Sequence, residues 1–240
     1  MEIIVADNYE RQSEIAADLV AEVITKKPDA WLGTATGSSP LGMYHELIKK
    51  YNNKEIDFSK VHTVNLDEYV GLPGTHEQSF RYYLNKNFFE KINIVLTNTH
   101  APVGVGDLEE NISEYNTILK NHDIDIQVLG VGDDGHLGFN EPGETLYDLT
   151  HVEELDERTV KANARFFDDI SQVPTKAITM GMGNILRAKQ LLLIVSGNKD
   201  AAMKKLLLDD RIDPKCPVTL LKLHRNAKVI LTKDLLTRIS

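Results

Sequence analysis

Residues 2–36 read EIIVADNYERQSEIAADLVAEVITKKPDAWLGTAT. A β-rich apolar run, EIIVA, is followed by the amphipathic segment RQSEIAADLVAEVITKK and then by a second apolar run, DAWLGTAT. Such alternation is typical of parallel strands joined by crossover helices, because parallel neighbours cannot be connected by a tight hairpin. These residues therefore predict an α/β fold.

The same alternation extends along the rest of the chain. Residues 40–51 form a second amphipathic stretch, and the next apolar run is VHTVNLDEY. We also expect strands at DIQVLGV, AITMG, QLLLIV and AKVILT, and helices near residues 107–120 and 199–208. Residues 143–175 are a long polar insertion between two expected core strands, and we interpret them as a lid. The prediction is a single domain over residues 1–240, with a Rossmann-like, mostly parallel sheet and helices on both faces.

The amino-acid composition limits the classes of molecule that the protein is expected to bind. The 240 residues include 36 acidic and 27 basic side chains, and the net charge of -9 disfavours nucleic acid and anionic membrane surfaces as partners. An anionic substrate must then meet local positive groups. The lone cysteine, Cys216, excludes an intrachain disulfide, and MEIIVADNYERQSEI carries acids where a secretory signal needs basic residues. Since no apolar run approaches the length of a membrane span, we expect a cytoplasmic protein with no membrane contact.

Three candidate segments follow expected strands, at the carboxyl ends where α/β sheets bind ligands. The first is GTATGSSPLGMY, in which Pro40 suits the first turn of a helix. Gly37 lets a ligand approach the backbone closely, and Ser38 and Ser39 offer hydroxyl and amide groups beside the positive end of the helix dipole. The turn is suited to hold phosphate, although it is neither a Walker motif nor GxGxxG. A plain helix N-cap at Ser39 is the alternative interpretation.

The second segment places two carboxylates, Asp67 and Glu68, at the polar exit of the run VHTVNLDEY. One of them can face the ligand cleft, while the other faces away or pairs with a base. A carboxylate held there is suited to remove a proton from a carbon next to a carbonyl or an imine. An acidic turn before a helix, without a chemical role, is the alternative.

The third segment, GVGDDGHLGFNEP, has four glycines, which allow conformations that other residues resist. Its side chains that carry chemistry are Asp133, Asp134, His136, Asn140 and Glu141. His136 titrates near neutral pH, and a flanking carboxylate would stabilise its imidazolium, so the loop is suited to move protons. Two alternatives stay open. One is a divalent metal ion bound by His136 with Asp134, Glu141 and His151, and the other is a glycine-rich turn with surface charges.

Five motifs, in register and spread over nearly the whole chain, carry a resemblance to a known family. They are ATGSSPLGMY, NLDEYVGL, GHLGFNEPG, ANARFF and VPTKAITMGMG. Together they resemble the motifs of glucosamine-6-phosphate deaminase, also called glucosamine-6-phosphate isomerase. The resemblance implies conversion of glucosamine 6-phosphate and water into fructose 6-phosphate and ammonia, with no cofactor and no catalytic metal. It therefore counts against the metal interpretation of the third segment.

The resemblance also implies a role for each catalytic residue. His136 is the acid/base that opens the pyranose ring, and Asp134 and Glu141 set its charge and orientation. Asp67 then takes the proton from C2 of the open-chain sugar and returns it at C1. Ring opening comes first, because a closed hemiacetal has no carbonyl to acidify the C2–H bond. Asp133 stands where other members commonly carry Asn or another residue, so the division of protonation between Asp133 and Asp134 stays open.

A phosphate anchor is implied as well. Its members here are Gly37, Ser38, Ser39 and Arg165, the last on the expected lid. Arg165 offers a planar fork that matches phosphate oxygens. The family usually adds a Lys within a Gly-led helix start. In GNKDAAM that position holds Asp200, and Lys199 stands one position early, so Lys199 is a further candidate for phosphate binding.

The region after the NEP motif bears on regulation and assembly. Hexameric members of the family are activated by N-acetylglucosamine 6-phosphate through basic groups in that region, which here carries Glu144, His151 and Glu153. We therefore expect no such activation, a monomer, and a small-molecule sugar phosphate as the partner. Two other functions remain open. A 6-phosphogluconolactonase-like hydrolase would not need Asp67 as a base, and a non-catalytic sugar-phosphate sensor domain would have no use for the full catalytic set.

Overall fold

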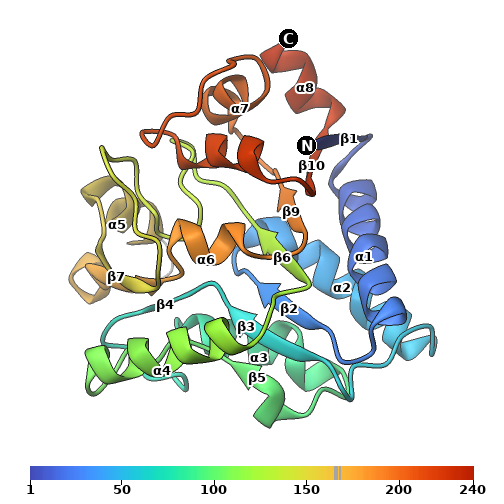
Figure 1. Cartoon of the computed structure of the whole chain (residues 1–240), viewed down its shortest axis with the longest axis vertical. Coiled ribbons are helices and arrows are strands. Elements are labelled where there is room, and N and C mark those ends of the chain that lie inside the picture. The colour runs from blue at the N-terminus through green and yellow to red at the C-terminus, as the bar shows by residue number, and fades with distance from the viewer. Residues whose placement is uncertain (165–166, 168) are drawn as a thin grey trace.

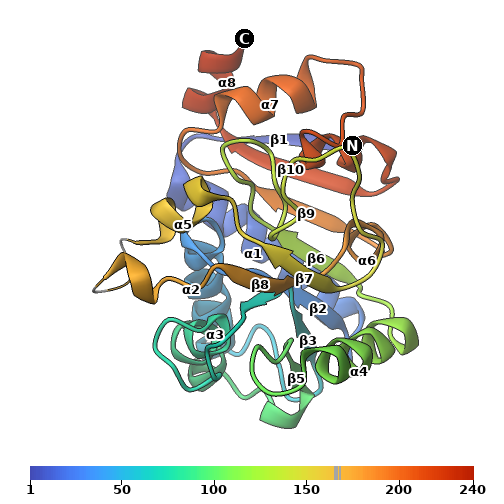
Figure 2. The same ribbon diagram turned by 90° about the vertical axis from the view of Figure 1, so that its left-hand side faces the viewer.

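The computed structural model describes residues 1–164, 167 and 169–240, which form two β-sheets. The larger sheet has seven strands in the order β1–β10–β9–β6–β2–β3–β5, and all its neighbouring strands are parallel (Figure 2). Its strands are β1 (Glu2–Ala6), β2 (Trp31–Thr34), β3 (His62–Asn65), β5 (Thr99–His100), β6 (Ile126–Leu129), β9 (Leu191–Ile194) and β10 (Ala227–Thr232).

Helices cover both faces of this sheet (Figure 1). One face packs against α1 (Tyr9–Lys26), α2 (Ser38–Asn52) and α3 (Phe80–Asn87), and the other against α4 (Leu108–Asn121), α6 (Met182–Leu186), α7 (Asp200–Leu207) and α8 (Lys233–Ile239). Along β9, Leu191 and Leu193 join one core, whereas Leu192 and Ile194 join the other. A strand buried on both faces reads as a continuous apolar run, which is why QLLLIV identifies β9 in the sequence.

The predicted fold class is confirmed, because the main sheet is parallel and has helices on both faces. The helices expected near residues 107–120 and 199–208 correspond to α4 and α7. The sequence reasoning missed the helices α3, α6, α8 and α5 (Glu157–Asn163) and the strands β5 and β7 (His151–Glu154). The four helices have eight residues or fewer, too short for an apolar periodicity to stand out. Among the described residues, no helix has the length and apolar composition needed to cross a membrane.

The run VHTVNLDEY, expected as one strand, is divided into β3 and β4 (Asp67–Tyr69). The chain turns at Leu66. Its N–H donates to the carbonyl of Thr34, and its own carbonyl accepts from the N–H of Met180, both at 2.9 Å. These bonds fix the end of β3 and move the following carboxylates out of the main sheet.

A second correction concerns AITMG, which was expected in the core sheet. Its first three residues belong to β8 (Lys176–Thr179), which pairs antiparallel with β4 and with β7 (His151–Glu154) in a separate three-stranded sheet. Ala177 and Ile178 of β8 are fully buried, so their apolar run looks like that of a core strand. Residues 143–175 therefore lead from the main sheet into the second sheet, to which they contribute β7, and they also contain α5 (Glu157–Asn163).

Candidate active site

Four loops meet at the carboxyl edge of the seven-stranded sheet, because β9, β6, β2 and β3 are consecutive neighbours. The loops are residues 35–37 before α2, residue 66 before β4, residues 130–142 after β6 and residues 195–199 before α7. The hydroxyl groups of Ser39 and Ser196, 2.6 Å apart, join the start of α2 to the loop before α7. An ion pair between Lys199 and Asp133 joins that loop to the one after β6.

The loop after β6 is folded around the ring of His136. A Cβ at Gly132 would lie 2.2 Å from a carbon of that ring, so only glycine leaves room for the imidazole. Asn140 fastens the loop, since its Nδ2 donates to the carbonyls of Leu137 and Met180 at 2.8 Å each. The glycine and the amide thus hold the imidazole in one place.

Two carboxylates face the imidazole of His136. Oδ1 of Asp134 lies 2.9 Å from Nδ1 of His136, and Oε2 of Glu141 lies 3.6 Å from the same nitrogen. Burial lowers the pKa of His136, but the two carboxylates outweigh burial and raise this pKa above its usual value. The hydrogen bond with His136 lowers the pKa of Asp134 to about 2. At neutral pH, Asp134 is therefore a fixed carboxylate beside a readily protonated ring.

Glu141 is held in place by the insertion. Oγ1 of Thr159, in α5, donates to Oε1 of Glu141 at 2.8 Å. Burial raises the pKa of Glu141, while His136 and Thr159 limit the rise. The other oxygen, Oε2, is buried and has no hydrogen-bond partner among the described residues. Glu141 therefore presents a free acceptor close to the imidazole.

Asp67 is a buried carboxylate at the start of β4, with 8% of its surface exposed. Burial and the neighbouring Glu68 raise its pKa to about 8, and the charge of His136 opposes this rise. Asp67 and His136 therefore interact electrostatically although they lie in different segments, β4 and the loop after β6. A carboxylate with a pKa near neutrality is a stronger base than an ordinary one, and such values cluster at functional sites.

Glu68, the other carboxylate of this segment, binds backbone amides at the start of α3. Its Oε1 accepts from the N–H groups of Tyr69 and Phe80, and its Oε2 accepts from the N–H of Arg81, each at 2.9 Å. These contacts satisfy backbone amides at the start of the helix. The two carboxylates thus have different surroundings, as one of the sequence interpretations expected.

The turn before α2 has the features of an anion cradle. Gly37 has a φ of 95°, a left-handed conformation that favours glycine. The carbonyl oxygens of Gly37 and Ser38 accept from the hydroxyls of Tyr83 (2.7 Å) and Tyr9 (2.6 Å), respectively. The first N–H groups of α2 have no acceptor within the helix, so they are available to an anion. Gly37 is the N-cap of α2, which overturns the alternative of Ser39 as a plain N-cap.

Lys199 directly precedes α7, and its Nζ pairs with Asp133. Its charge lowers the pKa of His136, although other groups outweigh it, so the two side chains interact. Asp200, at the position where the family usually has Lys, is bound by Arg238 of α8 at 3.1 Å. Arg165, the remaining expected phosphate ligand, lies outside the described residues.

Asp134, His136 and Glu141 also meet a geometric requirement for a metal site, because one potential ligand atom of each lies within 4.8 Å of the others. His151 does not join this group. Its Nε2 lies 3.0 Å from Glu153, and its ring stacks on another aromatic side chain at 4.1 Å. The interpretation of a metal site that includes His151 is therefore wrong.

Comparison with known proteins shows the family of the chain. Residues 7–231 match the family described as glucosamine-6-phosphate isomerases/6-phosphogluconolactonase. A protein of Clostridium perfringens strain 13 named glucosamine-6-phosphate deaminase is 48% identical over 236 residues, covering 98% of each chain. A protein of Clostridium beijerinckii with the same name is 44% identical over 241 residues, covering 100% of each. The chain belongs to the glucosamine-6-phosphate deaminase family.

Solved structures with the same fold include one from the deaminase family and one from a different enzyme. A structure described as a monomeric glucosamine-6-phosphate deaminase is similar over 100% of both chains, with a TM-score of 0.95 and 39% identity. A 6-phosphogluconolactonase from Thermotoga maritima has a TM-score of 0.74 at 16% identity, covering 96% of this chain and 98% of that one. The second likeness shows a shared fold alone.

The sequence reasoning missed two residues at this deaminase-family site, Thr159 and Ser196. Ser196 directly follows the apolar run QLLLIV. The rule that ligand-binding groups gather at the carboxyl ends of strands would have singled it out. Thr159 lies in the polar insertion, where no periodic pattern distinguishes one hydroxyl from another.

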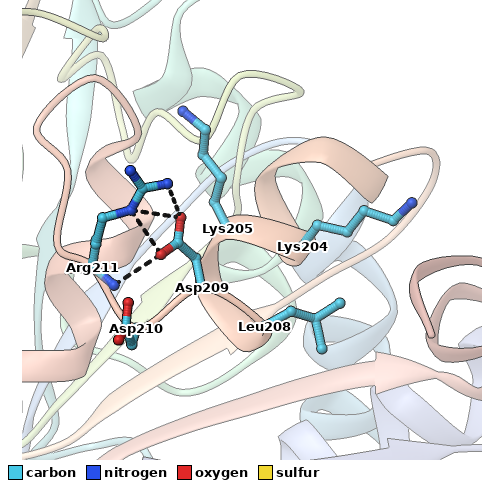
Figure 3. A pocket seen from close by; sticks show the side chains of 6 residues that line it. All are labelled: Lys204, Lys205, Leu208, Asp209, Asp210 and Arg211. Atoms are coloured by element: carbon cyan, nitrogen blue, oxygen red, sulfur yellow. Dashed lines mark hydrogen bonds and ion pairs between the residues drawn. The ribbon is translucent and has the colours of Figure 1, made fainter.

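The described residues also form two surface hollows. One, beside the end of α7, is lined by Lys204, Lys205, Leu208, Asp209, Asp210 and Arg211 (Figure 3). There the guanidinium of Arg211 pairs with Asp209 of the same turn at 2.7 Å, which satisfies both charges. The other hollow, of about 240 Å³, lies between the start of α3 and residues 99–104. Neither is lined by a predicted catalytic or phosphate-binding residue.

Proposed function

We propose that the protein isomerises and deaminates glucosamine 6-phosphate, with uptake of one water, to give fructose 6-phosphate and ammonia. One observation carries the proposal. Asp67, at the start of β4, and the group of Asp134, His136 and Glu141, in the loop after β6, lie at the same carboxyl edge of the sheet. Membership of the deaminase family supports the choice of reaction.

His136 opens the pyranose ring. The imidazolium gives a proton to the ring oxygen as the C1–O5 bond breaks, and the O1 hydroxyl returns a proton to the imidazole. Asp134, at 2.9 Å from Nδ1, stabilises the charged ring, and Glu141 adds a second negative charge beside it. The open chain has a C1 aldehyde, which acidifies the C2–H bond.

Asp67 then transfers the proton between carbons. Its carboxylate removes the proton from C2, the released electron pair forms the C1=C2 bond, and O1 takes a proton from the His136 imidazolium to give an enolamine; the imidazole regains a proton when water adds to C2. Asp67 returns its proton to C1, which leaves an iminium at C2. Water adds to C2 and ammonia leaves, so that a ketone remains. The pKa of about 8 supports this role, because it makes the Asp67 carboxylate an effective base.

The phosphate group is bound at the start of α2 and by the loop before α7. The proposed ligands are Gly37, Ser38, Ser39 and Lys199, together with Arg165. The left-handed turn at Gly37 and the positive end of the helix favour an anion there. These groups supply the local positive field that a chain with a net charge of -9 needs in order to bind an anionic sugar.

We further propose a monomer that works in the cytoplasm without a cofactor or a catalytic metal ion. The similar structure with a TM-score of 0.95 is described as monomeric, which supports the monomer. In the region where hexameric members bind their activator, this chain has Glu144 and Glu153, whose charges would repel a phosphorylated activator.

A coupled assay for ammonia and fructose 6-phosphate from glucosamine 6-phosphate tests the proposal. We expect equal amounts of the two products, deuterium at C1 of the ketose in D2O, and full activity with a chelator. Asp67→Asn should lose roughly 1000-fold in kcat, whereas Asp210→Asn, a control at an exposed acid, should keep its activity. Absence of ammonia would refute the proposed reaction, and loss of activity with a chelator would refute its metal-free form. Hydrolysis of 6-phosphogluconolactone without deuterium incorporation would instead favour the lactonase.

A further inference from the structure

The ion pair between Lys199 and Asp133 joins two partners with very different exposure. The side chain of Lys199 is 20% exposed, whereas that of Asp133 is 83% exposed. The carboxylate therefore reaches from solvent to a cation that the protein largely covers. Moving Asp133 back into water costs little, because an exposed carboxylate is already well hydrated. The covered ammonium, in contrast, needs an anionic partner.

The surroundings of Lys199 suit such an exchange of partners. Ser196, in the same loop, contacts Ser39 at the start of α2, so the loop lies beside the anion cradle. The neighbouring carboxylate, Asp200, does not compete for the ammonium, because Arg238 binds it at 3.1 Å. Asp133 is thus the carboxylate that forms an ion pair with Lys199 in the structure.

We propose that Asp133 is an internal competitor of the substrate phosphate: the phosphate binds Lys199 by displacing the Asp133 carboxylate into solvent. The inference rests on the proposed function, in which Lys199 is part of the phosphate anchor. Asp133 is then a specificity-determining residue for the reaction. A dianionic phosphate ester displaces the carboxylate more readily than a singly charged anion does, because its attraction to the ammonium is greater.

Binding of inorganic phosphate, measured by calorimetry at a pH where phosphate is a dianion, tests this inference. Asp133→Asn should lower the Kd for phosphate about 2- to 5-fold, the range set by a partly exposed ion pair. Lys199→Met should raise the Kd, and adding Asp133→Asn to it should bring no further change. The matched control is Asp123→Asn, which removes a carboxylate that is 78% exposed and precedes β6, at the opposite edge of the sheet.

The outcomes separate this inference from the proposed reaction. An unchanged or weaker affinity in Asp133→Asn would overturn the competition, and so would an equal gain in Asp123→Asn, which would trace the effect to net charge. Normal phosphate binding in Lys199→Met would overturn it as well, while leaving the deamination intact. If phosphate binding follows the expected pattern but no ammonia is formed, the competition is supported and the proposed reaction fails.

Discussion

Oγ1 of Thr159 donates a hydrogen bond of 2.8 Å to Oε1 of Glu141. The bond joins α5, within residues 143–175, to the carboxylate whose other oxygen faces His136. The lid interpretation of residues 143–175 stays a prediction. If the segment does move, the bond links that movement to the catalytic group, because a movement of α5 that breaks the bond removes a hydrogen-bond donor from Glu141.

Replacing Thr159 with Val removes this donor at nearly constant volume. Since Thr159 lowers the pKa of Glu141, that pKa should rise, and the acid limb of the kcat profile should move to higher pH. We expect kcat at neutral pH to fall roughly 3- to 10-fold, which corresponds to the loss of one hydrogen bond of about 1 kcal/mol. Thr159→Ser keeps the hydroxyl and should restore both values. Steady-state kinetics across the acid limb measure the change, and an unshifted profile in Thr159→Val would contradict the role.

The pH dependence of kcat/KM should reflect Asp67. This carboxyl must be ionised to remove a proton, and burial together with Glu68 raises its pKa to about 8. We therefore expect kcat/KM to increase as the pH rises toward about 8, because the ionised fraction of Asp67 grows, and loss of the His136 imidazolium limits the gain at higher pH. The raised pKa of His136 keeps its imidazolium populated over the lower part of this range. Initial rates at low substrate concentration measure the profile, and a plateau already reached at acidic pH would refute the assignment.

Burial of Asp67 also lowers the free energy of unfolding. Between the ordinary pKa of 3.8 and the folded value of about 8, the native state holds a proton that the unfolded state releases, so stability falls as the pH rises. Asn does not titrate. Asp67→Asn should therefore have a higher free energy of unfolding than the parent protein, with a larger gain near pH 8 than near pH 3.8. Urea unfolding at both pH values measures the difference.

Asp134→Asn should change the stability in the opposite direction. The hydrogen bond with His136 lowers the pKa of Asp134 to about 2, so its ionised form stabilises the fold above the unfolded value of 3.8. This variant should be less stable than the parent at neutral pH.

Equal pH dependence of unfolding in Asp67→Asn and the parent would show that burial of Asp67 does not determine its titration.

Trp31, the single tryptophan of the chain, stacks on His122 at 4.0 Å and on His62 at 4.5 Å. Burial, followed by the neighbouring His122, lowers the pKa of His62. Tryptophan fluorescence should therefore fall at a pH below 6.5, because a charged imidazole quenches the indole. Stability should decrease as the pH falls through the same window, since the unfolded histidine binds protons more readily. His62→Gln should reduce the change in fluorescence without abolishing it, because His100 and His122 also stack on Trp31, and His76→Gln, at an exposed position, should leave it intact.

Much of the architecture could be predicted from the sequence because β2, β6, β9 and β10 are buried and read as apolar runs. The rule that ligands bind at the carboxyl ends of parallel strands then brought Gly37, Asp67 and His136 to one edge. The second sheet could not be predicted, because β8 is as buried as a core strand and its composition does not reveal its partner. The contact of Thr159 with Glu141 depends on how the insertion folds back, for which the polar sequence carries no periodic signal.

β1 has a single partner in the sheet, β10, and the register places Glu2 opposite Lys228. During synthesis the ribosome releases the segment of β1 long before that of β10. β1 must therefore wait, with unpaired backbone groups, until residues 7–226 have emerged. Closure of this edge joins two segments that are far apart in the sequence, and the incomplete edge exposes the nascent protein to misassembly until then.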